Sequence, residues 1–391
     1  MKTFDTADVA VGYDYTDADP GVTALLDRKQ TRVSDHLSYS PIEVSAVETH
    51  LKNFFSKTAP GSTVRQVSRM GGGASKEQFL FTLDNGVSES KYVLRMDPIQ
   101  TAAETDRQRE FEVLNAFSKH LPAPRADWID YEGKEFGQPF AIMNFVPGVT
   151  KPTAKSDGPN VTGIGTTFNA KLRSELAPQF IKNLALIHNI DWRQEELPSF
   201  AEPRPNSQQS ALWQINWISR VWRDDKIHAS PVAAIAERWL RRNLPTNSDV
   251  SMIHGDYRTG NFLFDEESRE ITAILDWEWA HLGDFHEDLG WMLQDLYAST
   301  DDNQRLICGL LTREEMIEAY ESASGRTVDL KTLRWYEIFC AYKCYAITLA
   351  TSIKAARDGA NHQDVMLSWM APVGHRFATE ICKMIASEET A

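Results

Sequence analysis

The segment Ile253–Phe264, IHGDYRTGNFLF, sets the interpretation of this chain of 391 residues. It places a histidine, an aspartate, an arginine and an asparagine in one short loop between apolar runs. A second segment, AILDWEWAHLGDFHEDLG at residues 273–290, carries five acidic residues after another apolar run. Polar groups beside strand-like apolar runs are costly to bury unless they are paired, so both segments are candidate parts of a functional site.

The surrounding patterns predict two lobes of different composition. Strand-like runs and one glycine-rich turn precede residue 148, together with helical spacing at 40–57, starting from Ser40–Pro41, and at 104–120. The predicted strands are 62–70, 77–83, 91–96, 126–133 and 138–148. Helical patterns dominate after a loop-rich stretch at 149–165. We therefore expect an α+β fold with a small sheet-rich N-terminal lobe (41–146) and a larger helical C-terminal lobe (147–391), preceded by a loosely ordered or surface-packed extension (1–40).

Composition limits the classes of partner. The net charge of −14 argues against binding nucleic acid, which requires clustered Lys and Arg. No apolar run reaches the roughly 20 residues needed to span a bilayer, so no membrane partner is expected. The N-terminus has neither a basic start nor an apolar stretch, and the four cysteines form no CxxC pair. We therefore expect a cytoplasmic protein.

The small lobe offers groups that could hold phosphates. In GGGAS (71–75), Gly72, Gly73 and Ser75 could bring backbone N–H groups close to phosphate oxygens. Arg95 lies on a predicted strand and Glu110 on the next helix, the order in which kinases pair a phosphate-binding cation with a glutamate. Alone, the glycine run also fits an ordinary turn, and Arg95 a surface ion pair.

The two polar segments offer the remaining groups that phosphoryl transfer requires. Asp256 can accept a hydroxyl proton, and the amide oxygen of Asn261 can bind Mg²⁺. Asp276 follows an apolar strand, and Glu278 is placed to share its face. Asp288 is expected to brace the catalytic loop by bonding its backbone.

A rival interpretation takes part of the second segment as a metal centre. His281, Asp284, His286 and Asp288 have spacing that a hydrolase-type cluster could use. A helix cap formed by Asp284 and Glu287 would explain two of these acidic positions without any metal.

The pattern H-G-D-x-x-x-x-N at 254–261, followed by I-L-D-W-E at 274–278 and preceded by YVLRMDP at 92–98, resembles the aminoglycoside phosphotransferase and choline kinase superfamily. That superfamily has a protein-kinase-like fold, and the resemblance covers about residues 60–385. It is strongest to kinase-like domains associated with acyl-CoA dehydrogenases. Two departures are Lys76 after Ser75 and Phe285 after Asp284.

The resemblance implies site roles for individual residues. Asp256 is then the catalytic aspartate, and Asn261 and Asp276 are Mg²⁺ ligands. Arg95 and Glu110 are the phosphate-binding pair, with Arg in place of the commoner Lys. The backbone of Asn144 and of Val146 would meet adenine.

The resemblance implies ATP- and Mg²⁺-dependent phosphorylation of a small-molecule hydroxyl, such as that of a hydroxyacyl-CoA or another anionic catabolic intermediate. Aminoglycoside, choline or homoserine-type acceptors, a protein substrate and a non-catalytic nucleotide-binding module remain alternatives. Aromatic and basic residues favour an acceptor with an apolar and an anionic part. The candidate acceptor residues are Trp217, Arg220, Trp222, Arg223 and Glu278. Core aromatics and solvated charges are the competing explanation for the first four.

Overall fold

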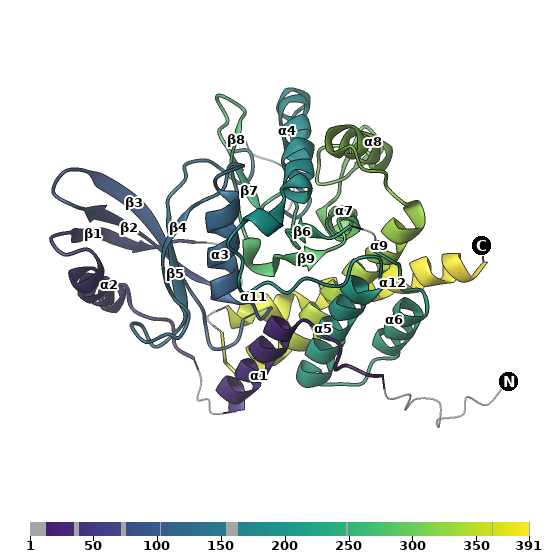
Figure 1. Cartoon of the computed structure of the whole chain (residues 1–391), viewed down its shortest axis with the longest axis horizontal. Coiled ribbons are helices and arrows are strands. Elements are labelled where there is room, and N and C mark those ends of the chain that lie inside the picture. Colours follow the sequence, from purple (N-terminus) through teal and green to yellow (C-terminus); the bar gives the residue numbers. More distant parts are fainter. Residues whose placement is uncertain are drawn as a thin grey trace.

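The computed structural model describes residues 13–34, 39–71, 76–101, 103–153, 163–247, 249–361 and 363–390. Its elements separate into a small sheet lobe and a large helical lobe, which confirms the predicted fold class (Figure 1). The small lobe is a five-stranded antiparallel sheet in the order β1-β2-β3-β5-β4. Its strands are β1 (Thr63–Arg69), β2 (Glu77–Asp84), β3 (Glu89–Met96), β4 (Ala126–Asp130) and β5 (Phe140–Asn144).

Helix α2 (Val44–Thr58) packs on this sheet through an aromatic core. Phe79 and Phe81 alternate along β2 and are fully buried, as are Leu51 and Phe55 of the helix. The period of two along a strand places such residues on one face, which is why the sequence pattern identified β2. The helix begins later than predicted, because Glu43 still has extended backbone (φ −68°, ψ 142°) and Ser40–Pro41 lie outside it.

Helix α3 (Arg107–Phe117) lies between the sheet and the large lobe (Figure 1). Its first turn is capped by the carboxylate of Asp106, which accepts hydrogen bonds from the backbone N–H groups of Gln108 and Arg109. The chain then reaches the large lobe through residues 145–153, directly after β5.

The large lobe is built mainly from helices. They are α4 (Ala170–Asn189), α5 (Gln209–Asp225), α6 (Pro231–Arg242), α7 (His286–Met292), α8 (Arg313–Ser324), α9 (Leu330–Ala346), α10 (Ile353–Arg357), α11 (Asp364–Trp369) and α12 (Ala371–Thr390). Helix α9 is buried along almost all of its length and continues through a π-helical stretch, Ile347–Ser352, into α10. Within the described ranges, no helix is both long and apolar enough to cross a bilayer.

Short antiparallel pairs of strands carry the two polar segments. They are β6 (Ser251–Ile253) with β9 (His281–Gly283), and β7 (Phe262–Phe264) with β8 (Ile271–Ile274). A third pair, β10 (Ser299–Asp301) with β11 (Gln304–Leu306), follows α7. Because each polar segment leaves a strand that is held by a partner, the loop residues start from fixed positions.

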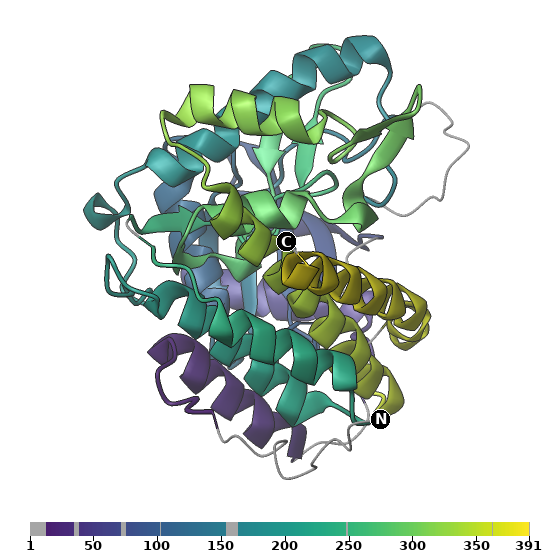
Figure 2. The same cartoon turned by 90° about the vertical axis from the view of Figure 1, so that its right-hand side faces the viewer.

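The described part of the predicted N-terminal extension contains a helix. Residues Pro20–Ser34 form helix α1, which lies beside α5 (Figures 1 and 2). Lys29 of this helix is 1% exposed and pairs with Asp225 of α5. Asp19, just before α1, holds Arg109 of α3 at 2.7 Å. The helix docks through the buried apolar side chains of Val22, Leu25 and Leu26 and through the buried ion pair of Lys29. Residues 1–12 lie outside the described part of the chain.

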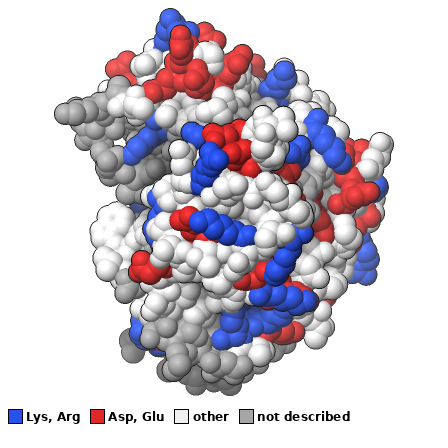
Figure 3. Space-filling model, turned by 90° about the vertical axis from the view of Figure 1, so that its left-hand side faces the viewer, with Lys and Arg blue, Asp and Glu red and all other residues white. Residues whose placement is uncertain are grey.

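Basic and acidic side chains are interspersed on the face of the small lobe (Figure 3).

Three of the four cysteines, Cys308, Cys340 and Cys344, are buried free thiols, whereas Cys382 is exposed.

Candidate active site

Asp256 lies in the loop between β6 and β7, and three donors hold its carboxylate. Oδ1 accepts hydrogen bonds from Trp291 Nε1 (2.7 Å) and Arg258 Nε (2.8 Å), and Oδ2 accepts one from Asn261 Nδ2 (2.5 Å). The backbone N–H of Leu275 donates to the carbonyl of Asn261 at 2.7 Å, which ties the loop to the segment after β8. The carboxylate is therefore oriented before any ligand arrives.

Asp288 of α7 braces this loop from beneath, as predicted. Its two oxygens accept hydrogen bonds from the backbone N–H groups of His254 and Gly255, each at 2.8 Å, and His188 Nε2 lies 3.1 Å from Oδ2. Burial raises the pKa of Asp288, but these histidines and N–H groups outweigh it and hold the pKa below its usual value. The brace therefore keeps its charge.

The surroundings of Gly255 and His254 explain why these two loop positions require glycine and histidine. Gly255 has φ +83°, and a Cβ there would lie 2.7 Å from the carbonyl oxygen of Trp279. Burial lowers the pKa of His254, so its ring is neutral near pH 7. Its Nδ1 faces the backbone N–H of Asp256 and its Nε2 faces the carbonyl of Leu275, so Nε2 carries the proton. His254 is thus a structural link between the two polar segments.

Asp276 follows β8 with a left-handed backbone, φ 59° and ψ 53°. This conformation is uncommon outside glycine, although Asp tolerates it better than most residues. Its side chain is 36% exposed, and Oδ1 accepts a hydrogen bond from Arg95 Nη2 at 2.7 Å. The strand end thus presents a carboxylate that touches the small lobe and still faces the solvent.

Asn261 and Asp276 fit the donor set that Mg²⁺ prefers. Asn261 uses its amide nitrogen for Asp256, which leaves its amide oxygen as the atom suited to a cation. Asp276 has a second carboxylate oxygen besides the one that contacts Arg95. Mg²⁺ binds hard oxygen ligands and usually keeps several waters, so one carboxylate and one amide oxygen are adequate.

Arg95 of β3 meets Glu110 of α3, as predicted. Nη1 of Arg95 donates to Glu110 Oε1 at 2.7 Å, and both side chains are buried. Arg107 also pairs with Glu110, and it contacts Glu278 at 3.2 Å. Arg95 therefore bridges the helix of the small lobe and Asp276 of the large lobe.

Lys76 and Asp97 complete this group and were not singled out by sequence. Lys76 Nζ lies 2.8 Å from Asp97 and 3.8 Å from Glu278. Burial raises the pKa of Asp97 and of Glu278, but the surrounding cations hold both pKa values below normal. The departure from the family pattern after Ser75 was the only signal for Lys76. The small-lobe ion cluster is Lys76, Arg95, Asp97, Arg107, Glu110 and Glu278.

The predicted nucleotide-contact residues are only partly described. Gly72, Gly73 and Ser75 lie outside the described residues. Asn144 ends β5, and its backbone N–H donates to the carbonyl of Arg125 at 3.0 Å. Its carbonyl is consequently the backbone group that adenine could meet, together with the half-buried Val146.

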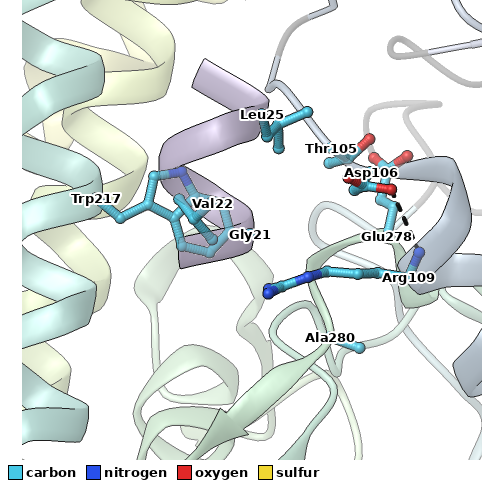
Figure 4. A pocket seen from close by; sticks show the side chains of 9 residues that line it. All are labelled: Gly21, Val22, Leu25, Thr105, Asp106, Arg109, Trp217, Glu278 and Ala280. Atoms are coloured by element: carbon cyan, nitrogen blue, oxygen red, sulfur yellow. Dashed lines mark hydrogen bonds between the residues drawn. The ribbon is translucent and has the colours of Figure 1, made fainter. Parts of the chain in front are cut away.

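The predicted acceptor residues divide into two groups. Trp217 and Glu278 line one small pocket between α1, the start of α3 and Ala280 (Figure 4). Trp217 also stacks on Trp279, with ring centroids 5.1 Å apart. Trp217 therefore packs against the segment that follows Asp276, which also contains Glu278.

The two arginines contact the N-terminal segment. Arg220 Nη2 pairs with Asp27 of α1 at 2.5 Å, and the guanidinium of Arg223 lies 4.1 Å above the Tyr15 ring. Trp222 packs against Tyr345 in the core. The basic side of α5 therefore faces the N-terminal segment, and the assignment of Arg220 and Arg223 to an acceptor wall stays a prediction.

The rival metal centre does not form. His281 contacts Glu287 at 3.1 Å, His286 contacts Asp284 at 2.6 Å, and Asp288 holds the loop backbone. Among the described residues, no three His, Cys, Asp or Glu side chains converge on a metal position. Asp284 caps the start of α7, since its Oδ1 accepts a hydrogen bond from the backbone N–H of His286 at 3.0 Å. The Glu287 half of the predicted capping box is absent, because Glu287 turns to His281 and Lys343.

The chain is similar to proteins of a known family. Residues 66–330 match the family model described as the phosphotransferase enzyme family. An Arabidopsis thaliana protein named as a probable acyl-CoA dehydrogenase is 26% identical over 304 residues, which are 72% of this chain and 35% of that protein. Acyl-CoA dehydrogenase family member 11 of Pongo abelii is 25% identical over 340 residues, 84% of this chain and 41% of that protein. The chain thus spans well under half the length of these relatives.

Solved structures share the fold at low sequence identity. A Ralstonia eutropha protein assigned to the aminoglycoside phosphotransferases has a TM-score of 0.59 and 20% identity, covering 88% of this chain and 99% of its own. Ethanolamine kinase of Plasmodium vivax has a TM-score of 0.53 and 12% identity, covering 96% and 97%.

Proposed function

The chain belongs to the phosphotransferase enzyme family, and from this premise we propose that it transfers the terminal phosphoryl group of ATP to a hydroxyl group of a small molecule. The family assignment makes it a small-molecule kinase with a hydroxyl acceptor. The dependence on ATP and on Mg²⁺, the identity of the acceptor and the roles of individual residues are parts of the proposal.

One observation carries the proposal: a continuous chain of contacts runs from the candidate base to the candidate phosphate-binding cation. Asp256 holds Asn261, the carbonyl of Asn261 holds the segment before Asp276, and Asp276 contacts Arg95. Phosphoryl transfer requires mainly positioning and charge stabilisation, so such a chain supplies what the reaction needs.

In this proposal Asp256 orients the acceptor hydroxyl and takes its proton. Asn261 and Asp276 hold Mg²⁺, which neutralises charge on the phosphate oxygens when bound. Arg95 contacts the phosphates, with Glu110 holding its guanidinium in place. We further propose that Gly72, Gly73 and Ser75 contact the phosphates and that the backbone of Asn144 and Val146 meets adenine.

The favoured acceptor is a hydroxyacyl-CoA or another anionic hydroxyl compound. Its support is the match to proteins named as acyl-CoA dehydrogenases, since a kinase related to them would act on compounds of similar chemistry. The solved structures named as an aminoglycoside phosphotransferase, an ethanolamine kinase and a choline kinase support an aminoglycoside- or choline-type acceptor as the second candidate. A homoserine-type acceptor stays an alternative from the sequence resemblance.

The test is ATP consumption by the purified protein with a panel of hydroxy acids, their CoA thioesters, choline, homoserine and kanamycin. We expect turnover with at least one acidic compound, loss of turnover with EDTA, and recovery with added Mg²⁺. Asp256→Asn should keep its fold and bind ATP, yet lose about 10²–10⁴-fold in kcat. ATP consumption that Asp256→Asn leaves unchanged would refute the assigned chemistry, and kanamycin turnover alone would refute the favoured acceptor.

A further inference from the structure

A lysine of α9 is buried among three tryptophan rings. The Nζ of Lys343 lies 4.0 Å from the ring centroid of Trp279, 5.0 Å from that of Trp291 and 6.0 Å from that of Trp217. The Lys343 side chain has no exposed surface. Tryptophan gives the strongest cation–π attraction of the aromatic residues, and the attraction grows when water is excluded. We call these three rings the tryptophan cage.

Hydrogen-bond and ion-pair partners alone offset only part of the free-energy cost of burying this ammonium group. Nζ lies 3.3 Å from Glu287 Oε1 and 3.3 Å from the carbonyl of Gly255. The other oxygen of Glu287 faces His281 at 3.1 Å. Burial raises the pKa of Glu287, but His281 and Lys343 outweigh it and hold the pKa below normal. Because an ammonium has three donors and is costly to bury, the rings are a necessary part of its environment.

The cage adjoins the candidate catalytic base. The indole N–H of Trp291 donates to Asp256 Oδ1 at 2.7 Å, while the same side chain faces Lys343. Gly255, whose carbonyl faces Nζ, directly precedes Asp256. Trp217 of the cage also lines the small pocket that contains Glu278 (Figure 4). The cage therefore extends from Asp256 to this pocket.

An aromatic cage of this kind suits an alkylammonium ligand, and here the protein's own lysine occupies it. We propose that Lys343 is a specificity-determining residue that fills the tryptophan cage beside Asp256 and thereby restricts the acceptor to neutral or anionic hydroxyl compounds. This inference rests on the proposed function, because Asp256 marks where the acceptor hydroxyl must lie. A cationic acceptor finds the cage occupied and meets a like charge, which lowers its affinity.

The first experiment tests the cage without any turnover. Lys343→Ala removes three carbons and the ammonium, which together correspond to n-propylammonium. Lys343→Met fills a similar volume without charge and is the matched control. At n-propylammonium concentrations about tenfold above Kd, the melting temperature of Lys343→Ala should rise by about 2 °C. The wild type and Lys343→Met should show no such rise, and neutral propan-1-ol should not reproduce it.

A rise in melting temperature that is the same in all three proteins, or that is absent from folded Lys343→Ala, would refute the tryptophan cage as a site for an alkylammonium ion.

The second experiment does not require Lys343→Ala to fold. It compares kcat/KM for two hydroxyl compounds of similar size, 3-hydroxypropanoate and 3-aminopropan-1-ol, in the wild type and in Lys343→Met. In the wild type we expect kcat/KM for the acid to exceed that for the amine at least about tenfold. In Lys343→Met this preference should fall about tenfold, because the positive charge that disfavours the amine is absent.

An equal preference in both proteins, or a wild-type preference for the amine, would refute Lys343 as the specificity determinant. The two proposals fail separately. Absence of ATP turnover with every hydroxyl compound would refute the proposed function, whereas the melting-temperature result would still decide whether the cage binds an alkylammonium ion.

Discussion

The two sides of the loop that carries Asp256 bury positive charge by different means. On one side, the small-lobe ion cluster surrounds Lys76, Arg95 and Arg107 with carboxylates. On the other side, Lys343 has one carboxylate partner and three tryptophan rings. The first arrangement is a network of buried ion pairs, and the second is a single cation among aromatic rings.

This difference indicates what each side can do when a ligand binds. Arg95 holds Asp276, whose side chain is 36% exposed, so a phosphate can replace that carboxylate as the partner of the guanidinium. Lys343 has no exposed surface and no comparable contact to exchange. The small-lobe ion cluster is therefore suited to binding a phosphate group. In our proposal, Lys343 and its tryptophan cage instead restrict the shape and charge of the acceptor.

The largest effect is expected where the two sides meet. Asp276→Ala removes a candidate Mg²⁺ ligand, and metal ions contribute several kcal/mol to transition-state stabilisation, so kcat should fall about 10³-fold or more. Nucleotide binding in Mg²⁺ should weaken, as measured by calorimetry. Asp265→Ala, a change in an exposed turn outside the site, is the control. Full activity of Asp276→Ala would remove this residue from the site.

A pair of substitutions tests the two ways of burying charge. Glu110→Gln leaves Arg95 and Arg107 short of a buried partner, so urea unfolding should show a loss of about 3–5 kcal/mol. Glu287→Gln should cost less, about 1–3 kcal/mol, because the tryptophan rings still stabilise Lys343. If Glu287→Gln proves the more damaging change, the rings do not carry the role assigned to them.

The docking of α1 is expected to have an intermediate effect. Asp19→Asn weakens the contact in which Arg109 Nη2 donates to both carboxylate oxygens, and charged hydrogen bonds of this kind contribute about 1–3 kcal/mol. Asp27→Asn is the matched control, since Asp27 is largely exposed and its pair with Arg220 should contribute no more than about 1 kcal/mol. Equal losses of stability in the two variants would show that α1 does not depend on its buried ion pair.

The smallest effect should appear in the pH dependence of the free energy of unfolding, through a buried histidine of the large lobe. Burial lowers the pKa of His188 below 6.5, so the unfolded state binds a proton that the folded state does not. Stability is therefore present above about pH 6.5 and decreases as pH falls towards the folded pKa, by at most about 1.4 kcal/mol per pH unit. His188→Gln should flatten the stability profile between pH 6.5 and 5, whereas exposed His228→Gln should not.

Sequence patterns identified most residues of the candidate site because they record local chemistry. The spacing of Asp256, Asn261 and Asp276 follows from loops that leave short paired strands, and the order of Arg95 and Glu110 follows from a strand and the next helix. Asp288 was likewise identified as the brace of the loop, and the structure confirms its two backbone contacts. In each case the residue type and its neighbours in the chain were sufficient evidence.

Other features depended on contacts between distant segments. Arg220 and Arg223 looked suited to an anionic acceptor, but they face residues of the N-terminal segment, which lies nearly 200 positions away for Arg220 and Asp27. No sequence pattern marked Lys343 as part of a site. Its cage is assembled from α5, the segment after Asp276, and α7, and no local pattern predicts which rings will surround one ammonium.

The sequence by itself therefore determined the α+β class, the two polar loops and the chemistry that their carboxylates and amide can perform, because these depend on residue type and short-range order. The tertiary structure decided which charges share one site: it brought Lys76 and Arg107 to Glu278, docked α1 against α3 and α5, and enclosed Lys343 in tryptophan rings. The physical reason is that burying a charge requires partners within a few ångströms, and only the packing of remote segments brings those partners together.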